Sequence, residues 1–180
     1  QGGSNAEVVI ADAFVKGLEG INYKLGLDAM LKDAMFPPGG NEEKEGRGGL
    51  VDYNRLGYVS TNYVRSGNRT LEYAYDDYCL AIVAKGIKRK GEYWSFIKQS
   101  DNWQNLWRDN GSRGFIMPKD ANGKWVDSIQ CAATNGKINY IPYTPLAQDW
   151  PNCVCWWCGF FYEASSWEYS LSVPHDVAML

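Results

Sequence analysis

The chain has 180 residues, of which 45% are hydrophobic and 22% charged, and its formal net charge is −3. This length is enough for one domain with a buried core, and the composition argues against intrinsic disorder. The small net charge argues against a nucleic-acid or anionic-membrane partner, because phosphate binding needs a clustered basic surface. No stretch reaches the apolar length of a membrane-spanning helix. We therefore expect a domain that binds neither nucleic acid nor membrane.

Apolar residues at helical spacing predict a mainly α fold in the first 107 residues. The expected helices cover 6–18, 27–35, 51–56, 68–85 and 92–107. Ser4 or Asn5 is the expected N-cap of the first helix and Asn68 that of the fourth, because such side chains accept bonds from free backbone N–H groups. Two prolines and two glycines at 37–40 end the second helix, and a polar loop follows over 41–49.

The sequence changes character after residue 107. An Asn-Gly pair at 122–123 predicts a tight hairpin turn within 115–126. The stretch 131–151, rich in Gly, Asn and Pro, is typical of a long loop, and a last helix is expected to begin at Pro174. Helices in succession with small β excursions predict an all-α array, either a piece of a helical toroid or a solenoid.

Five cysteines are present, at positions 79, 131, 153, 155 and 158. The first lies in the helix pattern of 68–85 and is interpreted as a small buried apolar residue. The spacing of the last three is compatible with zinc, but a structural zinc site needs four ligands, and His175 is the only histidine. Disulfides in a secreted protein are the favoured alternative.

Two tripeptides, Asn-Arg-Thr at 68–70 and Asn-Gly-Ser at 110–112, have the pattern of N-glycosylation sites. Together with the cysteines they favour a secreted or extracytoplasmic location. The chain begins with Gln1 and ends at Leu180 within a helix pattern, so we expect both ends to be cuts through a longer protein. A missing leader then does not argue against secretion.

Carboxylates are the remaining candidates for chemistry, because the chain has one histidine and neither a nucleophile elbow nor a phosphate-binding motif. Glu163 lies within the aromatic stretch 160–169. A carboxyl group in apolar surroundings has a raised pKa, as a general acid at a glycosidic bond needs. The alternative is a surface glutamate in an aromatic loop, which the spacing alone favours.

The acidic residues of the predicted helix at 68–85 have a structural interpretation. Glu72 and Asp76 lie four residues apart on one face, with Asp77 next in sequence. Like charges at this spacing repel, and Arg69 could supply the counter-charge. A structural ion pair is therefore the preferred interpretation.

Two further pairs of charged or titratable residues have similar interpretations. Asp12 and Lys16 lie four apart and fit an ion pair on a helix surface. Asp176 suits the first turn of a helix that begins at Pro174, because a negative charge is favourable there. Nothing local favours a ligand role over a structural role for His175.

Four motifs occur in order along the chain. They are Ala-Asp-Ala-Phe-Val-Lys-Gly at 11–17, Gly-Tyr-Val at 57–59 with Arg-Thr-Leu-Glu-Tyr-Ala-Tyr-Asp-Asp at 69–77, Gly-Phe-Ile-Met-Pro-Lys-Asp at 114–120, and a stretch from Glu163 to Pro-His-Asp at 174–176. As an ordered set, which spans nearly the whole chain, they resemble glycoside hydrolase family 92.

The resemblance implies an exo-acting, calcium-dependent α-mannosidase that inverts the anomeric centre. Members have an N-terminal β-sandwich and a C-terminal (α/α)6 toroid. Residues 1–180 are therefore expected to form part of the toroid, without the β-sandwich and without the C-terminal remainder. The implied substrate is a mannose-containing oligosaccharide or N-glycan, and an α-1,2 linkage is the favoured choice.

The resemblance also assigns roles to individual residues. Glu163 falls on the family's general acid, and Trp167 falls on an aromatic residue that can wall the sugar subsite. Tyr169, His175 and Asp176 are further candidates for substrate binding because they belong to the same motif.

The sequence departs from the family in ways that bear on activity. Residues 164–165 are Ala-Ser where many members have Gly-Asn, and the cysteines at 153–158 look specific to one lineage. The family's general base lies in an Asp-Asp motif downstream of the Pro-His-Asp signature, and residues associated with calcium lie largely outside this chain. We therefore expect no metal ligands here, and an inactive fragment of an active parent.

Three other functions are compatible with the sequence. One is a different toroidal glycosidase, such as a glucoamylase-like enzyme, which mannoside hydrolysis inhibited by chelators would argue against. Another is a non-catalytic carbohydrate-binding fragment, which would bind sugar without hydrolysis in the full-length parent. The third, a zinc-binding interaction module, rests only on the cysteine spacing, and metal content would test it.

Overall fold

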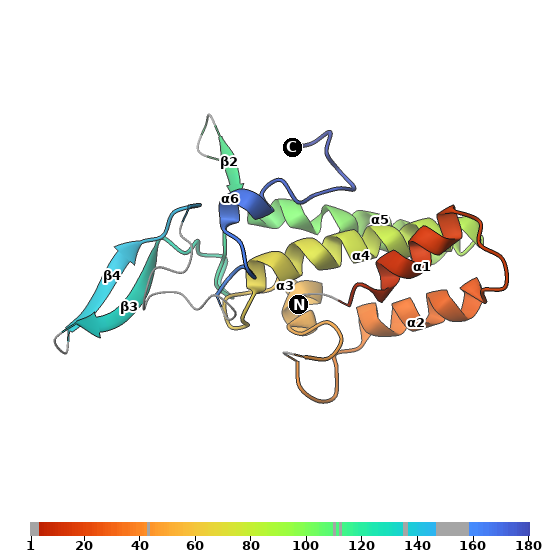
Figure 1. Cartoon of the computed structure of the whole chain (residues 1–180), viewed down its shortest axis with the longest axis horizontal. Helices are drawn as coiled ribbons and strands as arrows, with labels where there is room; N and C mark the ends of the chain where they lie inside the picture. The colour runs from red at the N-terminus through yellow and green to blue at the C-terminus, as the bar shows by residue number, and fades with distance from the viewer. Residues whose placement is uncertain (1–3, 43, 110, 112, 135–136, 147–158) are drawn as a thin grey trace.

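The computed structural model describes residues 4–42, 44–109, 111, 113–134, 137–146 and 159–180. Its helices are α1 (Ala6–Val15), α2 (Tyr23–Met35), α3 (Leu50–Leu56), α4 (Ser66–Gly86), α5 (Lys90–Gln99), the 3₁₀ helix η1 (Ser100–Leu106) and α6 (Ser166–Tyr169). Two antiparallel pairs of strands complete it, β1 (Trp107–Asp109) with β2 (Gly114–Ile116) and β3 (Ser128–Thr134) with β4 (Lys137–Pro142). Figure 1 shows the β3–β4 hairpin projecting away from the helices.

Helix α4 is the centre of the fold. It contacts α1, α2, α5 and η1, and most of its residues are buried. Its apolar residues are spread around the helix rather than confined to one stripe, as expected for a helix that is covered on several sides. Side chains from α1, α2, α4 and α5 form one core cluster, which includes Ala11, Leu27, Met30, Leu80, Val83 and Phe96.

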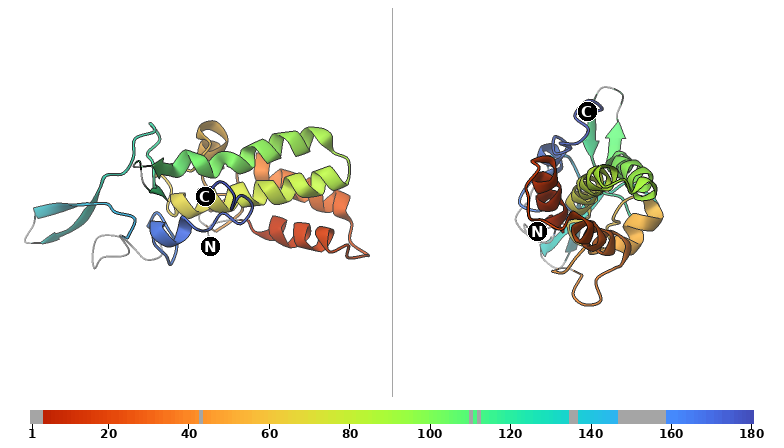
Figure 2. Two further views of the ribbon diagram at one scale, coloured as in Figure 1. Left: turned by 90° about the horizontal axis from the view of Figure 1, so that it is seen from above. Right: turned by 90° about the vertical axis from the view of Figure 1, so that its right-hand side faces the viewer.

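The two ends of α4 have different neighbours. The left view of Figure 2 shows α1 and α2 along the C-terminal half of α4, whereas α6 lies near its N-terminal end. A second core cluster near that end joins α4 to η1, β2 and the segment before α6, and it includes Leu71, Trp103, Leu106, Ile116 and Phe161. None of the described helices combines the length and the apolarity needed to cross a bilayer.

The helices predicted in the first 107 residues are present, but two predicted caps are wrong. The side chain of Asn5 makes no capping bond to α1, whereas Asn22 caps α2 by accepting from the Leu25 N–H at 3.1 Å. Asn68 lies buried inside the first turn of α4. The residue before α4 is Arg65, in a left-handed conformation, so the entry to this helix is set by tertiary contacts rather than by a capping side chain.

The predicted helix over 92–107 is divided. The α-helix ends at Gln99, and η1 continues with tighter 3₁₀ turns to Leu106. The Ser100 hydroxyl donates to the Ile97 carbonyl at 2.7 Å, and the Asn105 amide donates to the Gly57 carbonyl at 3.0 Å. Serine and asparagine side chains compete with the helix for backbone partners, which explains the change.

The predicted tight turn at 122–123 is confirmed. Gly123 is left-handed, with φ 83°, and its N–H donates to the Asp120 carbonyl at 3.1 Å. The long loop predicted over 131–151 is wrong where β3 and β4 pair, with Ile129 opposite Ile141. The backbone pairing of β3 with β4 overrides the loop composition there.

The helix predicted from Pro174 is also wrong. Residues 174–180 form turns, and the side chains of Val177 and Met179 are exposed. A short helix without a buried apolar face is marginal, because packing supplies most helical stability. The short helix of this region is instead α6, which begins at a capping box formed by Ser165 and Glu168.

Candidate active site

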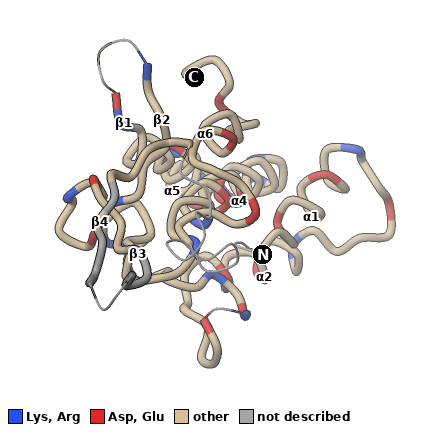
Figure 3. The backbone as a smooth tube through the Cα atoms, turned by 60° about the vertical axis from the view of Figure 1, so that its left-hand side comes forward, with Lys and Arg blue, Asp and Glu red and all other residues tan. Residues whose placement is uncertain are grey.

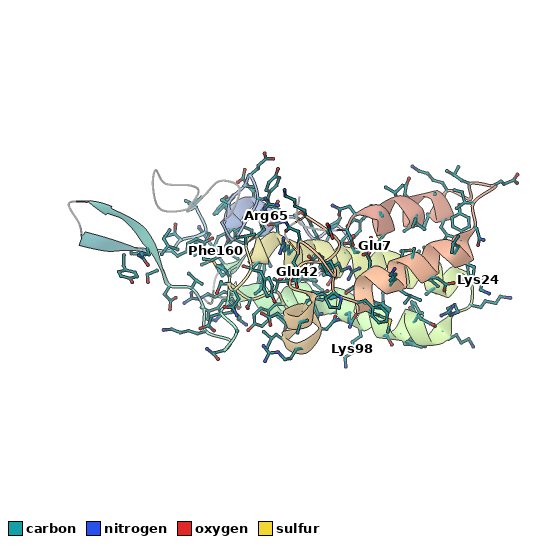
Figure 4. All side chains as sticks on the ribbon, turned by 90° about the horizontal axis from the view of Figure 1, so that it is seen from below. Glu7, Lys24, Glu42, Arg65, Lys98 and Phe160 are labelled. Atoms are coloured by element: carbon teal, nitrogen blue, oxygen red, sulfur yellow. The ribbon has the colours of Figure 1, made fainter. Side chains whose placement is uncertain are left out.

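The segment 159–163 is anchored on the N-terminal end of α4. The Arg65 N–H donates to the Gly159 carbonyl at 2.6 Å, and the Gly67 N–H donates to the Phe160 carbonyl at 2.9 Å. A Cβ at Gly67 would clash with the ring of Phe161 and lie 3.0 Å from the Phe160 carbonyl oxygen. Glycine at this position therefore allows the segment to approach the helix. Figure 4 shows Arg65 and Phe160 at this end of the molecule, opposite Lys24.

Glu163 lies at the exposed end of this anchored segment. Its side chain is exposed, and its backbone is left-handed, with φ 56°. A residue other than glycine in this region costs on the order of 1–3 kcal/mol and persists only where neighbouring contacts hold it. The apolar enclosure predicted for the carboxyl group is wrong for the part of the chain described, because Glu163 is exposed while Phe161 packs against Gly67 of α4 and Trp167 against Phe115.

Tyr169 connects α6 to the residue before Glu163. Its hydroxyl donates to the Tyr162 carbonyl at 3.0 Å, and its ring stacks on Phe161 with centroids 5.3 Å apart. Burial, together with the nearby charges of Glu72 and Glu163, raises the pKa of Tyr169 to about 12. The hydroxyl therefore keeps its proton at neutral pH and remains a hydrogen-bond donor.

Trp167 lies on α6, which is held against β2. The Ser166 hydroxyl donates to the Ile116 carbonyl, and the Ile116 N–H donates to the Ser170 hydroxyl at 2.8 Å. The indole of Trp167 is 44% exposed and tilts against Phe115, with ring centroids 5.2 Å apart. One part of the indole is thus supported by protein and another is open, as a sugar-stacking surface requires.

A small open hollow of about 290 Å³ lies beside α6. Its lining residues are Ala164, Glu168, Tyr169 and Ser172. The guanidinium carbon of Arg65 lies 4.8 Å from the centroid of the ring of Tyr162, the residue before Glu163. The region around Glu163 therefore combines an exposed carboxyl group, aromatic surfaces and a guanidinium group.

His175 and Asp176 lie apart from this region. The Nε2–H of His175 donates to the Ser100 carbonyl at 2.9 Å, and its ring stacks on Tyr75 with centroids 5.7 Å apart. Burial lowers the pKa of His175, so the ring is neutral at pH 7. Tyr75 is eight residues beyond Gly67, a rise of about 12 Å along α4. The structure thus brings together Glu163 and Tyr169 but not His175, and a substrate-binding role for His175 and Asp176 stays a prediction.

The ion pair predicted between Arg69 and Glu72 is wrong. The Arg69 guanidinium donates to the Glu42 carbonyl at 3.1 Å, and Glu72 accepts from the Asn68 amide at 3.3 Å. Arg69 and Glu72 do lie three residues apart on α4, but the Arg69 side chain reaches the loop before α3 instead of Glu72. The ion pair predicted for Asp12 and Lys16, by contrast, is confirmed, with 2.7 Å between the charged atoms.

Arg47 forms a buried ion pair that the sequence did not predict. Its Nη1 lies 2.6 Å from Asp77 Oδ1, and its Nη2 lies 3.3 Å from Glu7 Oε1. Asp77 Oδ2 also accepts from the Tyr53 hydroxyl at 2.8 Å. The one signal in the sequence was a basic residue between glycines in a short loop, which gave no indication of its partners.

Asp76 is buried beside this ion pair without a hydrogen-bond partner for either oxygen. Burial raises its pKa well above the ordinary value, against the opposing effect of Arg47. Figure 3 shows acidic residues in red along α4. Among the described residues, no group of three histidine, cysteine, aspartate or glutamate side chains is arranged to hold a metal ion. These carboxylates therefore do not form a calcium site by themselves.

Two sequence motifs for secretion have different outcomes. Asn68 is fully buried, so the glycosylation site predicted at 68–70 is wrong. Residues 110 and 112 of the second site lie outside the described residues.

Cys79 has a buried free thiol, as predicted. The cysteines at 153–158 and the side chain of Cys131 lie outside what the structure describes, so the zinc and disulfide hypotheses stay predictions.

Comparison with known proteins connects this geometry to one family. The model of the glycosyl hydrolase family 92 catalytic domain matches residues 1–180. A protein of Arthroderma benhamiae described as an uncharacterized secreted glycosidase is 34% identical over the whole chain, which covers 24% of that protein.

Solved structures of two mannosidases from Bacteroides thetaiotaomicron are also similar. A family 92 inverting mannosidase is 28% identical with a TM-score of 0.78, over 98% of this chain and 20% of that one. A family 92 α-mannosidase in complex with mannoimidazole is 29% identical with a TM-score of 0.73, over 96% of this chain and 20% of that one. The chain thus spans about a fifth to a quarter of the length of these relatives. Their (α/α) fold confirms the predicted fold class.

Proposed function

Because the chain belongs to glycosyl hydrolase family 92, we propose that the protein of which it is part is an inverting exo-α-mannosidase. Its substrate is a mannose-containing oligosaccharide or N-glycan, with terminal α-1,2-linked mannose as the first choice. The similarity to mannosidases, one of them solved with mannoimidazole, supports this substrate class. The secreted relative supports an extracytoplasmic location.

The observation that carries the proposal is the presentation of Glu163. Its carboxyl is exposed at the end of an anchored segment, on an unusual backbone conformation, and the open indole of Trp167 follows four residues later. In the proposed reaction Glu163 is the general acid and protonates the oxygen of the departing sugar. Trp167 packs against the apolar face of the mannose and orients it toward this proton.

Inversion requires a second carboxylate that activates a water on the opposite side of the sugar, roughly 6.5–9.5 Å from the acid. We propose that this general base lies downstream of residue 180 and that residues 1–180 alone are inactive. A calcium requirement is also part of the proposal. The described carboxylates do not form a metal site, so residues elsewhere in the full-length protein would hold the ion.

The test is hydrolysis of α-1,2-mannobiose by the full-length protein, with added calcium and then with chelator, followed by NMR of the released anomer. We expect calcium-dependent release of β-mannose. Glu163→Gln should lower kcat about 10²- to 10⁴-fold, the usual contribution of a general acid. Glu19→Gln, an exposed glutamate in the loop after α1, is the matched control and should change nothing.

Three outcomes would contradict parts of the proposal. Initial release of the non-reducing-end mannose as the α-anomer would contradict inversion, and full activity of Glu163→Gln would contradict its role as the acid. Binding of mannosides without hydrolysis of any linkage would indicate a carbohydrate-binding protein instead of an enzyme.

A further inference from the structure

The backbone around Glu163 is held from both sides. On the N-terminal side, the Tyr162 carbonyl accepts from the Tyr169 hydroxyl at 3.0 Å. On the C-terminal side, Ser165 begins α6 in a capping box, where its N–H donates to Glu168 Oε2 at 2.7 Å. Glu163 therefore lies between two fixed points only three residues apart.

The left-handed backbone of Glu163 persists only if these two fixed points hold it. The left-handed region disfavours residues with a Cβ, so a free segment would relax to an extended or right-handed conformation. Such a change would rotate the Glu163 side chain away from its present direction. The bond from Tyr169 acts directly on this geometry, because the Tyr162 carbonyl belongs to the peptide unit whose nitrogen is that of Glu163.

The hydroxyl of Tyr169 is suited to this task. It stays protonated, its pKa being raised to about 12, and the ring is fixed by stacking on Phe161. Phe161 itself is buried against Gly67 of α4. The bond thus links Glu163 to the most buried helix of the fold through rigid groups. A hydroxyl that already donates to the backbone is also poorly placed to donate to a sugar.

We infer that Tyr169 is a positioning residue for Glu163, which acts by holding the Tyr162 carbonyl, rather than a residue that binds the substrate. This inference rests on the proposed function, since it concerns the presentation of the general acid. It replaces the substrate-binding role that the sequence suggested for Tyr169.

The test compares two substrates, of which only one has a leaving group that needs a proton. A sugar leaving group must be protonated as the glycosidic bond breaks, whereas a dinitrophenolate departs without a proton. The full-length protein and its Tyr169→Phe variant are assayed on α-1,2-mannobiose and on 2,4-dinitrophenyl α-mannoside. Tyr58→Phe is the matched control, because the Tyr58 hydroxyl also donates to a backbone carbonyl, that of Asp120, at 2.8 Å.

A positioning role predicts a selective effect. Tyr169→Phe should lower kcat on mannobiose about 10- to 100-fold, the scale of a misplaced catalytic group, and leave kcat on the dinitrophenyl substrate within a few-fold. KM should change little on either substrate. Glu163→Gln should give the same pattern with a larger loss, and Tyr58→Phe should affect neither substrate.

Other results would overturn the inference. Equal losses on both substrates, or a raised KM, would show that Tyr169 contacts the sugar, and no loss would show that it does not hold Glu163. A wild-type protein that hydrolyses neither substrate would overturn the proposed function and the inference with it. If Tyr169→Phe does not fold, Glu168→Ala removes the carboxylate that accepts from the Ser165 N–H, which is the other fixed point, and should show the same selectivity. Equal losses of Glu168→Ala on both substrates, or no loss, would also overturn the inference.

Discussion

Arg47 and Asp77 form an ion pair of 2.6 Å in which neither side chain has any exposure. It joins the loop before α3 to α4, and Glu7 from α1 extends it at 3.3 Å. Burial of a charge is costly unless partners compensate it, so each of these residues depends on the others.

Arg47→Met should destabilise the protein by about 3–5 kcal/mol, because it leaves two carboxylates buried without their cation. Urea unfolding would measure the change. Arg55→Met is the control, since the Arg55 side chain is 61% exposed and pairs with Asp52 at 3.3 Å. Its cost should be about 0–1 kcal/mol. Equal effects of the two substitutions would contradict a structural role for the buried pair.

Stability should fall as the pH rises above the ordinary carboxyl range. Burial raises the pKa of Glu7, Asp76 and Asp77 in the folded protein. At pH values between the ordinary pKa and the raised pKa of each group, the folded state binds more protons than the unfolded state. The free energy of unfolding therefore decreases with pH over that interval. The contribution of Asp76 is fully present below its ordinary pKa of 3.8 and is lost as the pH passes the raised value.

Asp76→Asn should flatten this decrease and stabilise the protein at neutral pH relative to wild type. Unfolding curves between pH 4 and pH 8 would show it. Asp12→Asn is the control, because the Asp12 side chain is 58% exposed, and it should leave the slope unchanged. A wild-type stability that increases with pH over this interval would contradict the prediction.

Gly67→Ala should displace the segment that carries Glu163, because the added methyl group overlaps the Phe161 ring. Overpacking of this kind costs about 1–3 kcal/mol, and mannosidase activity should fall with stability. Gly91→Ala is the matched control on α5, where nothing lies within 4 Å of the new Cβ. It should be neutral or stabilising, because alanine favours a helix over glycine by about 1 kcal/mol.

Trp167→Ala should weaken binding of the mannoside without loss of fold. An aromatic contact contributes about 1 kcal/mol, which corresponds to a KM about fivefold higher. Trp94→Ala removes another exposed indole, 67% accessible and located on α5, and should leave KM unchanged. An unchanged KM for Trp167→Ala would mean that its exposed face does not contact the sugar.

The helical part of the fold follows from local patterns in the sequence. The apolar positions of 27–35 and 68–85 recur at helical spacing, and α2 and α4 follow them. The ordered motifs also predicted the family, which the comparisons show. Helical spacing is a local feature, and the motifs identify the family as an ordered set along the chain. Both can therefore be recognised without knowing which segments are in contact.

Features that depend on contacts between distant segments could not be predicted from local patterns. The partner of Arg47 lies thirty residues away on α4, and the entry to α4 at Arg65 is set by the Gly159 carbonyl. The left-handed conformation of Glu163 likewise persists because Tyr169 and α4 hold its neighbours. Local preference favours other conformations at each of these positions, and long-range contacts outweigh it because they give polar groups hydrogen-bond partners that a local conformation would not supply.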